Sequence, residues 1–433
     1  MNEVIFTIVL SIIGFFVIVT LIKNYIFLFI APFFPVREKL RYIKQMKKRK
    51  AAGLPQYEPL VSVIVPAWNE EVGVLKTIES IVNNGYRNTE LIVVNDDSSD
   101  NTEQVVTNYI TAYESKSKRH RPITSIRYIL QPRGGKGTGL NNGIKAATGD
   151  IILTVDADSM LQKGAIEKLV KYYLDDEIMA VVGNVEVINA STIYGLAQQL
   201  EYYFGFYNKR AHALMGAEYI FGGACASFRK EVFDKIGLFD TENKTEDIEM
   251  SMRTKVYGLK STYAEDVVCY TEGASDLRGL IAQRIRWKKG RLDTFIKYRS
   301  LFFSTKDEHN VALSFFVLPF SLLMEIQLLF EPLAIASIIA YTIITTEYLS
   351  LAIGLGFIAL VFMAVSLFHS NRPRPLLTLY FPFFWPLFYL LDWIEFLALY
   401  KSVSMIRHRK DVEWQNWKRQ GITVSSSKRK AKA

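Results

Sequence analysis

Cysteine is almost absent from this sequence. Its 433 residues include only two cysteines, Cys225 and Cys269. Two cysteines cannot build a disulfide framework or a cysteine-rich zinc site. The scarcity of cysteine therefore fits a protein domain that lies in a reducing compartment.

Two common nucleotide-binding motifs are missing as well. The stretch GGKGTG resembles a phosphate-binding loop, but a Walker sequence requires a glycine where Leu130 stands and a serine or threonine where Gly137 stands. A dinucleotide fingerprint that starts at Gly137 and Gly139 would require its third glycine at Asn142. The ATPase and dehydrogenase functions therefore lose their best support.

The features of a cleaved signal peptide are also lacking. Residues 4–34 are almost wholly apolar, but Asn2 and Glu3 replace the usual basic start, and Pro32 and Pro35 stand near the end. About 20 apolar residues are enough to cross a bilayer as a helix. We expect a retained transmembrane anchor here.

What the chain has in excess is apolar sequence at both ends. Half of its residues are hydrophobic, the share being 50%, and the mean hydropathy is +0.12. Towards the C-terminus, residues 311–341 (with Pro332 inside), 349–368 and 376–399 are three further candidate spans. Three crossings would leave the basic tail outside, against the positive-inside rule. Either the first segment is a hairpin of two helices or the proline-interrupted last one re-enters without crossing.

The net charge of +9 is concentrated beside these apolar segments. The basic stretch 37–50 follows the first of them, and the tail ends in SSSKRKAKA. Dense Lys and Arg beside a span mark the cytoplasmic side, and they also favour contact with anionic lipid. We therefore expect a lipid bilayer as a partner, a cytoplasmic middle domain, and no nucleic acid.

The middle of the chain, residues 59–272, alternates short β-branched runs with helix-like segments. The expected strands are residues 61–65, 91–94, 126–130, 151–155 and 180–182, and helices are expected to begin near Glu70, Asp100, Gly137 and Gly164. This alternation predicts an α/β fold with a mostly parallel sheet and helices on both faces. Ligands of such sheets bind beyond the carboxyl ends of the strands.

Polar residues follow four of these strands. They are Asn69 and Glu70, Asp96, Lys136, and the pair Asp156 and Asp158. Each group on its own could simply cap the next helix. Convergence of all four at one sheet edge is more typical of a ligand site.

The pair Asp156 and Asp158 has the oxygen ligands that Mg²⁺ or Mn²⁺ prefers. Successive side chains of a strand face opposite ways, so the D-x-D spacing at this strand end puts both carboxylates on the same side. Further on, Thr245-Glu246-Asp247 precedes a helix-like segment, where acids could either complement the helix dipole or supply a general base.

A third polar motif is QRIRW. Gln283, Arg286 and Trp287 have the helical spacing that places them on one face. The neighbouring Lys288, Lys289 and Arg291 are typical of a helix on a membrane surface, with its basic side chains toward lipid headgroups.

Taken in order, VSVIVPAWNEE, LIVVNDDSSDNT, GGKGTGLNNGI, TVDADS, FGGACASFRKEVFDKIGLFD, TED and QRIRW resemble family 2 glycosyltransferases. The likeness covers residues 59–291 and points to the membrane-integrated, processive branch that includes cellulose, chitin, hyaluronan and poly-N-acetylglucosamine synthases. It implies a GT-A-like fold flanked by transmembrane helices at both ends. It also implies an inverting transferase that uses a UDP-sugar with Mg²⁺ or Mn²⁺.

The resemblance also implies roles for individual residues. Asp247 resembles the general base, next to Glu246, and Asp96 resembles the acid that holds uracil, although Asp97 stands where the family usually has Gly. Asp156 and Asp158 resemble the diphosphate-binding and metal-binding acids. The expected nucleotide-sugar contacts are Pro66, Asn69, Glu70, Asp96, Lys136, Asp156, Gln283, Arg286 and Trp287.

The resulting domain prediction has six parts. They are a transmembrane anchor (1–36), a basic linker (37–58), a GT-A catalytic domain (59–272), amphipathic interface helices with QRIRW (273–310), transmembrane helices (311–402) and a basic tail (403–433). The polar residues Glu325, Gln327 and Glu331 inside an apolar run are expected to face a wet interior or a partner.

Three functions stay open at this point. One is a multi-pass polysaccharide synthase of the cell membrane, which extends a glycan and moves it across the bilayer. The second is a transferase that makes one bond to a lipid acceptor, similar to ceramide glucosyltransferases. The third is an inactive nucleotide-sugar sensor, which is disfavoured because Asp96, Asp156, Asp158 and Asp247 are all present. Donor sugar, acceptor and oligomeric state are left open.

Overall fold

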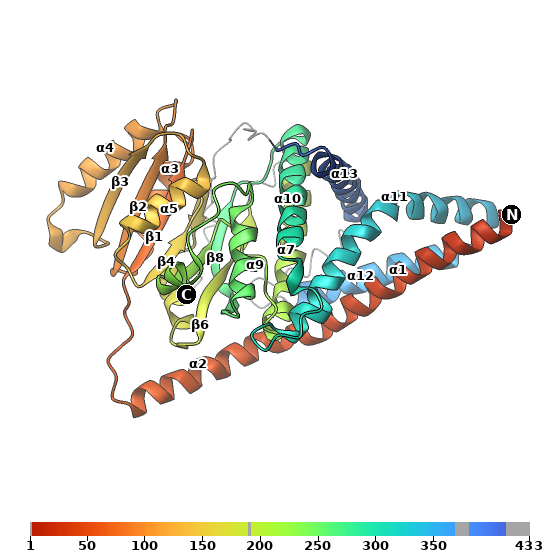
Figure 1. Ribbon diagram of the computed structural model, residues 1–433, viewed down its shortest axis with the longest axis horizontal. Coiled ribbons are helices and arrows are strands. Elements are labelled where there is room, and N and C mark those ends of the chain that lie inside the picture. The colour runs from red at the N-terminus through yellow and green to blue at the C-terminus, as the bar shows by residue number, and fades with distance from the viewer. Residues whose placement is uncertain (1, 189–191, 369–380, 413–433) are drawn as a thin grey trace, which may run out of the picture.

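Long apolar helices from both ends of the chain lie on one side of a central α/β unit (Figure 1). The computed structural model describes residues 2–188, 192–368 and 381–412. The start of the last predicted apolar segment, 376–380, and most of the basic tail, 413–433, lie outside the described residues.

The central sheet has eight strands in the order β3-β2-β1-β4-β7-β6-β8-β5. Their bounds are β1 Val61–Ala67, β2 Thr89–Asp96, β3 Ser125–Gln131, β4 Ile151–Thr154, β5 Ser159–Leu161, β6 Ile178–Val187, β7 Ala226–Arg229 and β8 Lys260–Thr271. The pairs β1–β2, β1–β4, β2–β3 and β6–β8 are parallel. The predicted α/β class with a mostly parallel sheet is confirmed.

The sequence prediction omitted three strands, β5, β7 and β8. Strand β7 runs antiparallel to both of its neighbours, β4 and β6, and the short β5 runs antiparallel to β8. The sheet is therefore mixed beyond β4. Strand β4 also ends at Thr154, one residue before the predicted end, so Asp156 and Asp158 lie in the turn that leads to β5.

Alternating side chains give the sheet two apolar faces, as period-two strands require. Val61, Val63 and Val65 of β1 join one buried cluster, while Ile64 joins the other. The first cluster is covered by α3 (Val74–Val82), α4 (Thr102–Glu114), α6 (Ala165–Tyr172) and α7 (Ile193–Leu214), and the second by α5 (Lys136–Ala146), α8 (Glu231–Ile236) and α9 (Glu246–Val256).

The remaining helices lie towards the apolar ends of the chain. They are α1 (Asn2–Ile30), α2 (Phe34–Ala51), α10 (Leu277–Lys297), α11 (Leu318–Thr345), α12 (Tyr348–Phe368) and α13 (Phe381–Arg407). Helices α1 and α2 form one long line, joined by a 3-10 turn, and α11 and α12 run beside α1 (Figure 1).

Within the described residues, two helical stretches are long and apolar enough to cross a membrane, Gly14–Ala51 and Leu313–Thr345. They pack together across the two ends of the chain. The rings of Phe16 and Phe330 stack with centroids 6.1 Å apart, and Thr20 Oγ1 donates a hydrogen bond to Gln327 Oε1 at 2.8 Å. Gln327 thus meets a partner, as expected for a polar group in an apolar run.

Candidate active site

Four parallel strands, β3, β2, β1 and β4, bring their carboxyl ends to one edge of the sheet. Asn69 and Glu70 follow β1, Asp96 is the last residue of β2, and Asp156 comes two residues after β4. The topology therefore gathers the polar residues that the sequence placed at strand ends.

Asp96 is buried and holds the loop that follows β3. Its Oδ1 accepts hydrogen bonds from Gln131 Nε2 and from the Gly134 amide, both at 2.7 Å, and its Oδ2 accepts one from the Gly135 amide at 2.9 Å. Lys136, the first residue of α5, follows directly. Asp96 therefore fixes the backbone that delivers Lys136 to the site.

Asn69 and Glu70 tie the loop after β1 to the loop after β2. Asn69 Oδ1 accepts from the Ser99 amide at 2.8 Å, and the Glu70 amide donates to Thr102 Oγ1 at 2.8 Å. Pro66 packs against α5: a Cβ added at Gly139 of that helix would lie 3.4 Å from the Cβ of Pro66. These three residues shape the edge through backbone and packing contacts.

The centre of the candidate site is Lys136. Its ammonium lies 2.6 Å from Asp156 Oδ1 and 3.3 Å from Glu246 Oε1. Helix α5, the turn after β4 and the first turn of α9 meet at this one cation. Three separate sequence motifs are therefore joined by two ion pairs.

The electrostatics follow from this clustering. Burial by itself would lower the pKa of Lys136, but the carboxylates of Asp156, Glu246 and Asp247 outweigh it and raise that pKa above its usual value. Burial raises the pKa of Glu246 above 4.5, Lys136 opposes the rise, and Asp247 adds to it. Lys136 therefore stays charged, while Glu246 binds a proton more readily than an ordinary glutamate.

Asp247 is held by backbone amides and stays partly accessible. Its Oδ2 accepts from the Gly223 amide at 2.9 Å and its Oδ1 from the Ile248 amide at 2.8 Å. A Cβ on Gly223 would lie 2.7 Å from Lys136 Nζ and 3.2 Å from Asp247 Oδ2. A side chain at position 223 would therefore have to displace the Lys136 ammonium.

Asp158 faces a different group of residues from Asp156. The sequence predicted that the alternation of side chains along a strand puts the carboxylates of Asp156 and Asp158 on one side. That prediction is wrong, because the strand ends at Thr154 and both residues lie in the turn that follows. The Thr77 hydroxyl of α3 holds this turn by donating to Ala157 O at 2.8 Å. The turn directs Asp156 to Lys136 and leaves Asp158 on a neighbouring pocket.

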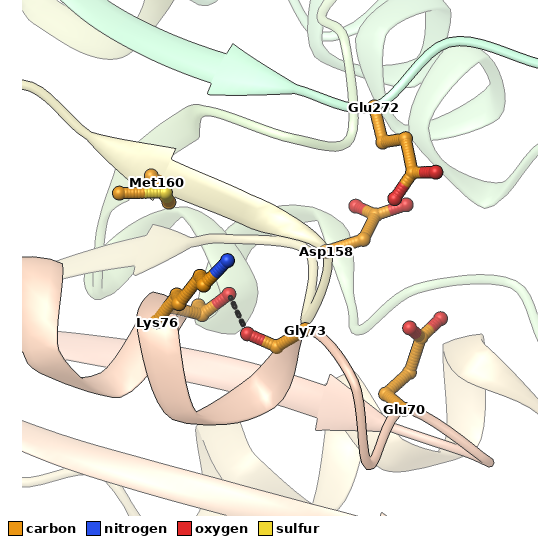
Figure 2. A pocket seen from close by; sticks show the side chains of 7 residues that line it. Glu70, Gly73, Lys76, Asp158, Met160 and Glu272 are labelled. Carbon is orange, nitrogen blue, oxygen red and sulfur yellow. Dashed lines mark hydrogen bonds between the residues drawn. The ribbon is translucent and has the colours of Figure 1, made fainter. Parts of the chain in front are cut away.

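That pocket is lined by Glu70, Lys76, Asp158 and Glu272, among others (Figure 2). Ser159 pairs with Thr271 in the antiparallel β5–β8 ladder, so the residues just outside the pair, Asp158 and Glu272, stand opposite each other. Figure 2 shows their carboxylates facing one another. Two like charges in this position repel unless a cation or proton lies between them.

The donor atoms at this edge suit a hard divalent cation. Mg²⁺ and Mn²⁺ take carboxylate oxygens and complete their shells with water and phosphate oxygens. Within the described part of the chain, no group of three or more His, Cys, Asp and Glu side chains is close enough to hold a metal. The facing carboxylates of Asp158 and Glu272 match such an ion in ligand type, and phosphate oxygens of a bound substrate would have to supply further ligands.

The QRIRW motif lies on α10. Gln283 is buried, and its Oε1 has no hydrogen-bond partner among the described residues. Trp287 stacks on Tyr202 of α7, with ring centroids 6.4 Å apart. Burial raises the pKa of Tyr202. The negative charge of Asp158 raises this pKa further and the positive charge of Arg286 lowers it, so both residues lie within electrostatic range of Tyr202.

The expected lipid-facing position of Lys288 and Arg291 is wrong. Lys288 lies 2.7 Å from Glu325 Oε2, and Arg291 lies 3.0 Å from Glu325 Oε1. Lys289 pairs with Asp293 of its own helix at 2.7 Å. Acidic residues on the apolar helices bind Lys288 and Arg291 because buried cations need partners.

Several residues around the candidate site were not predicted from the sequence. They are Glu272, Gly223, Tyr202 and the pair Trp68 and Arg133, in which the guanidinium lies 3.3 Å from the centroid of the tryptophan ring. Trp68 and Gly223 could have been found, because they stand inside quoted motifs, and Arg133 comes directly before the GGKGTG stretch. Glu272 and Tyr202 carried no local signal, since only the pairing of β5 with β8 and the packing of α7 on α10 bring them in.

Two family patterns match the sequence. Glycosyl transferase family 2 matches residues 62–237, and Glycosyl transferase family group 2 matches residues 151–405. The second match covers more than half of the chain and runs from the Asp156 turn through α10 into α13.

Two staphylococcal polysaccharide synthases are similar to this chain in sequence. The poly-beta-1,6-N-acetyl-D-glucosamine synthase of Staphylococcus aureus (strain COL) is 29% identical over 276 residues, which are 63% of this chain and 63% of that protein. The synthase of the same name from Staphylococcus epidermidis is 27% identical over 326 residues, 72% of this chain and 75% of that protein. The chain thus matches just under two thirds of the length of the Staphylococcus aureus relative.

A solved structure supports the fold. The mannosyltransferase PcManGT from Pyrobaculum calidifontis, in complex with GDP-Man and Mn²⁺, superposes with a TM-score of 0.53 at 20% identity. The superposition covers 90% of this chain and 100% of that one. At this identity the likeness shows a shared architecture and no more.

Proposed function

The chain belongs to Glycosyl transferase family group 2 and is thus a glycosyltransferase, and we propose that it extends a β-linked polysaccharide from UDP-N-acetylglucosamine. The observation that carries the proposal is the contact of Lys136 with both Asp156 and Glu246, beside Asp247. The choice of sugar rests on the two staphylococcal relatives, whose names specify a polymer of N-acetyl-D-glucosamine.

The chemistry assigned to Asp247 is removal of the proton from the acceptor hydroxyl. Its carboxylate is partly accessible and is oriented by the amides of Gly223 and Ile248, which a general base requires. Attack from the face opposite the leaving group gives inversion, so an α-linked donor yields a β-linkage. Glu246, paired with Lys136, would keep that ammonium beside the base.

The leaving diphosphate gains negative charge as its bond to the sugar breaks. Lys136 and Arg286 supply positive charge at the candidate site, and preorganised cations stabilise such charge as it develops. Gln283 Oε1, which has no partner among the described residues, would accept a hydrogen bond from a sugar hydroxyl. Trp287, stacked on Tyr202, would offer an aromatic surface to the acceptor.

Mg²⁺ or Mn²⁺ is assigned to the side of the site where Asp158 faces Glu272, with Asp156 two residues earlier in the same turn. A bound cation would neutralise the diphosphate and make it a better leaving group. Asp96 is assigned to the uracil base, which would share its carboxylate with the amides of Gly134 and Gly135. Pro66, Asn69 and Glu70 would shape the nucleotide pocket around it.

The proposed setting is the cell membrane, with the domain at 59–272 in the cytoplasm. Helices α1 and α11 have the length and apolar composition to cross the bilayer. Residues 37–58 would be the basic linker, 273–310 the interface region, 311–402 the further membrane helices and 403–433 the tail. In this arrangement the growing glycan would leave the cytoplasm through the same protein.

The decisive experiment incubates membranes containing the full chain with labelled UDP-N-acetylglucosamine and separates long polymer from organic-soluble lipid. We expect label in a polymer, and we expect Asp247→Asn to reduce incorporation at least about 100-fold because the base is lost. UDP binding, measured by titration on the purified protein, should be unchanged in this variant.

Other outcomes have definite meanings. Label in a lipid fraction would establish a single-transfer enzyme instead of a synthase. Incorporation from UDP-glucose alone would replace the proposed sugar. Equal loss of UDP binding and transfer in Asp247→Asn would show that Asp247 supports the nucleotide pocket and is not the base.

A further inference from the structure

Helix α10 has a basic face whose side chains form ion pairs with glutamates of the apolar helices α11 and α13. Arg284, Lys288 and Arg291 follow one another at helical spacing and so point to one side. Lys288 Nζ lies 2.7 Å from Glu325 of α11 and 2.9 Å from Glu395 of α13. The α10 charge network consists of Arg284, Lys288, Arg291, Glu201, Glu325 and Glu395.

The pairs in this network are shielded from water. The side chains of Lys288 and Glu325 are 7% and 8% exposed, and that of Glu395 is 17% exposed. Charges removed from water require their partners in place, because an unpaired buried charge is costly. While the pairs are intact, α10 therefore cannot shift relative to α11 and α13.

The opposite face of α10 touches Thr245, two residues before the proposed base Asp247. A Cβ on Gly290 would lie 2.0 Å from Thr245 Oγ1, so the helix backbone is packed directly against Thr245. Asn243 accepts from the Thr245 amide at 3.0 Å and donates to Thr294 of α10 at 3.3 Å. Thr245 is the N-cap of α9, which begins Glu246-Asp247.

We propose that Lys288 is a positioning residue for sugar transfer. It bridges α11 and α13 and holds α10 so that Gly290 sets the place of Thr245, and with it the Asp247 carboxylate. The position of the membrane helices is thereby linked to the geometry of the base. This inference rests on the proposed function, because the role of Asp247 is assigned there.

The test compares Lys288→Met, Lys288→Arg and Lys289→Met in the full-length protein in lipid nanodiscs. Transfer is measured as kcat per UDP-binding site, so a loss of folded protein cancels out. We expect Lys288→Met to lower kcat by roughly 10- to 100-fold, as small displacements of a reacting group do, with UDP affinity unchanged. Lys288→Arg should restore most of the rate, since it keeps the charge.

Lys289→Met is the matched control, because the side chain of Lys289 pairs within α10 and with Asp411 instead of the α10 charge network. It should keep the kcat of the unmodified protein. If Lys288→Met does not fold, Glu325→Gln tests the same link, and kcat should fall while UDP binding persists.

An unchanged kcat in Lys288→Met or Glu325→Gln, an equal loss in Lys289→Met, or no recovery in Lys288→Arg would each overturn the inference. Failure of the proposed function is distinguishable, because the unmodified chain would then transfer no sugar at all.

Discussion

Two residues at the sheet edge of the candidate site adopt a backbone conformation that usually favours glycine. Asn69 has a φ of 54° and Asp97 a φ of 56°. Asn and Asp tolerate this left-handed region better than other non-glycine residues. The conformation of Asp97 explains how it occupies a place where the resembled family usually has Gly, and it leaves Asp96 as the residue whose carboxylate points inward.

At the same scale, the pKa of Glu246 predicts a pH dependence. Because burial raises that pKa above 4.5, acidification protonates Glu246 earlier than an ordinary glutamate and weakens its hold on Lys136. We expect the transfer rate to fall on acidification with an apparent pKa above 4.5. The pH–rate profile of Glu246→Gln should be slower throughout, and its acidic limb should move to lower pH because the group with the raised pKa is gone.

The stability consequence has a defined sign. Because the pKa of Glu246 is raised in the folded protein, its contribution to stability is fully present below its unfolded pKa and is lost as the pH rises through the folded pKa.

The control for the pH–rate profile is Glu231→Gln, on the exposed face of α8, which should keep the acidic limb. An acidic limb that stays at the same pH in Glu246→Gln would assign the titration to another group.

At the scale of elements, α10 is a helix with two working faces. One face carries Gly290 toward Thr245 at the start of α9, and the other carries Lys288 toward α11 and α13. Helix α9 is also joined to it by the pair between Lys297 and Glu249 at 2.9 Å. Lys288 and Gly290 are two positions apart, which puts them on nearly opposite sides of a helix with 3.6 residues per turn.

The close approach of α10 to α9 predicts the effect of adding one methyl group. In Gly290→Ala the new Cβ would lie 2.0 Å from Thr245 Oγ1, so the two helices must separate. We expect unfolding stability to fall by about 1–3 kcal/mol, the usual cost of overpacking. We also expect kcat to fall by roughly 10- to 100-fold, as Asp247 is displaced.

A matched glycine separates packing from helix propensity. Gly205 lies on the exposed side of α7, and a Cβ added there would have no neighbouring atom within 4 Å. Gly205→Ala should therefore be neutral or stabilising by up to about 1 kcal/mol. Thermal unfolding in detergent and the transfer assay are the two measurements. A Gly290→Ala protein with normal kcat would show that the packing of Gly290 on Thr245 does not determine the position of Asp247, the proposed base.

At the scale of the whole molecule, the ends of the chain form one apolar body. Phe27 of α1 packs on His212 of α7 and on Phe316, just before α11, with ring centroids 4.9 and 6.2 Å apart. The α/β unit is thereby attached to segments near both ends of the chain. This arrangement suits a catalytic unit held against a membrane by helices that the sheet itself does not need.

Cysteine labelling can test that placement. Both native cysteines, Cys225 and Cys269, are buried, so they should react little with impermeant maleimides. Lys44→Cys on α2 and Glu347→Cys, between α11 and α12, each add one exposed thiol. If α1 and α11 each cross once, intact cells should be labelled from outside at position 347 and, at position 44, only after permeabilisation. Labelling of both positions from the same side would rule out this topology.

Much of the site was predictable from local sequence. Strand-ending residues such as Asp96 and Asp156 were found because a β-branched run followed by polar residues is a local pattern, and parallel strands bring such ends together. Glu272 was not predictable in this way. It meets Asp158 only because β8 and β5 are antiparallel neighbours at the edge of the sheet.

The basic residues of α10 show the same limit more sharply. From the sequence, Lys288 and Arg291 suited lipid headgroups, since neither has an acid three or four positions away on its own helix. Their partners, Glu325 and Glu395, stand 37 and 107 positions beyond Lys288 by residue number. Local periodicity carries no information about which distant helix will supply a countercharge.

By itself, the sequence determined the α/β class, the apolar ends and the inventory of chemically active side chains, because each of these follows from composition or from short-range periodicity. Only the tertiary structure decided that Asp156 turns to Lys136 while Asp158 turns to Glu272, and that α10 faces acids instead of lipid. The physical reason is that charge pairing and close packing act between atoms in space, and chain folding brings those atoms together from positions far apart in the sequence.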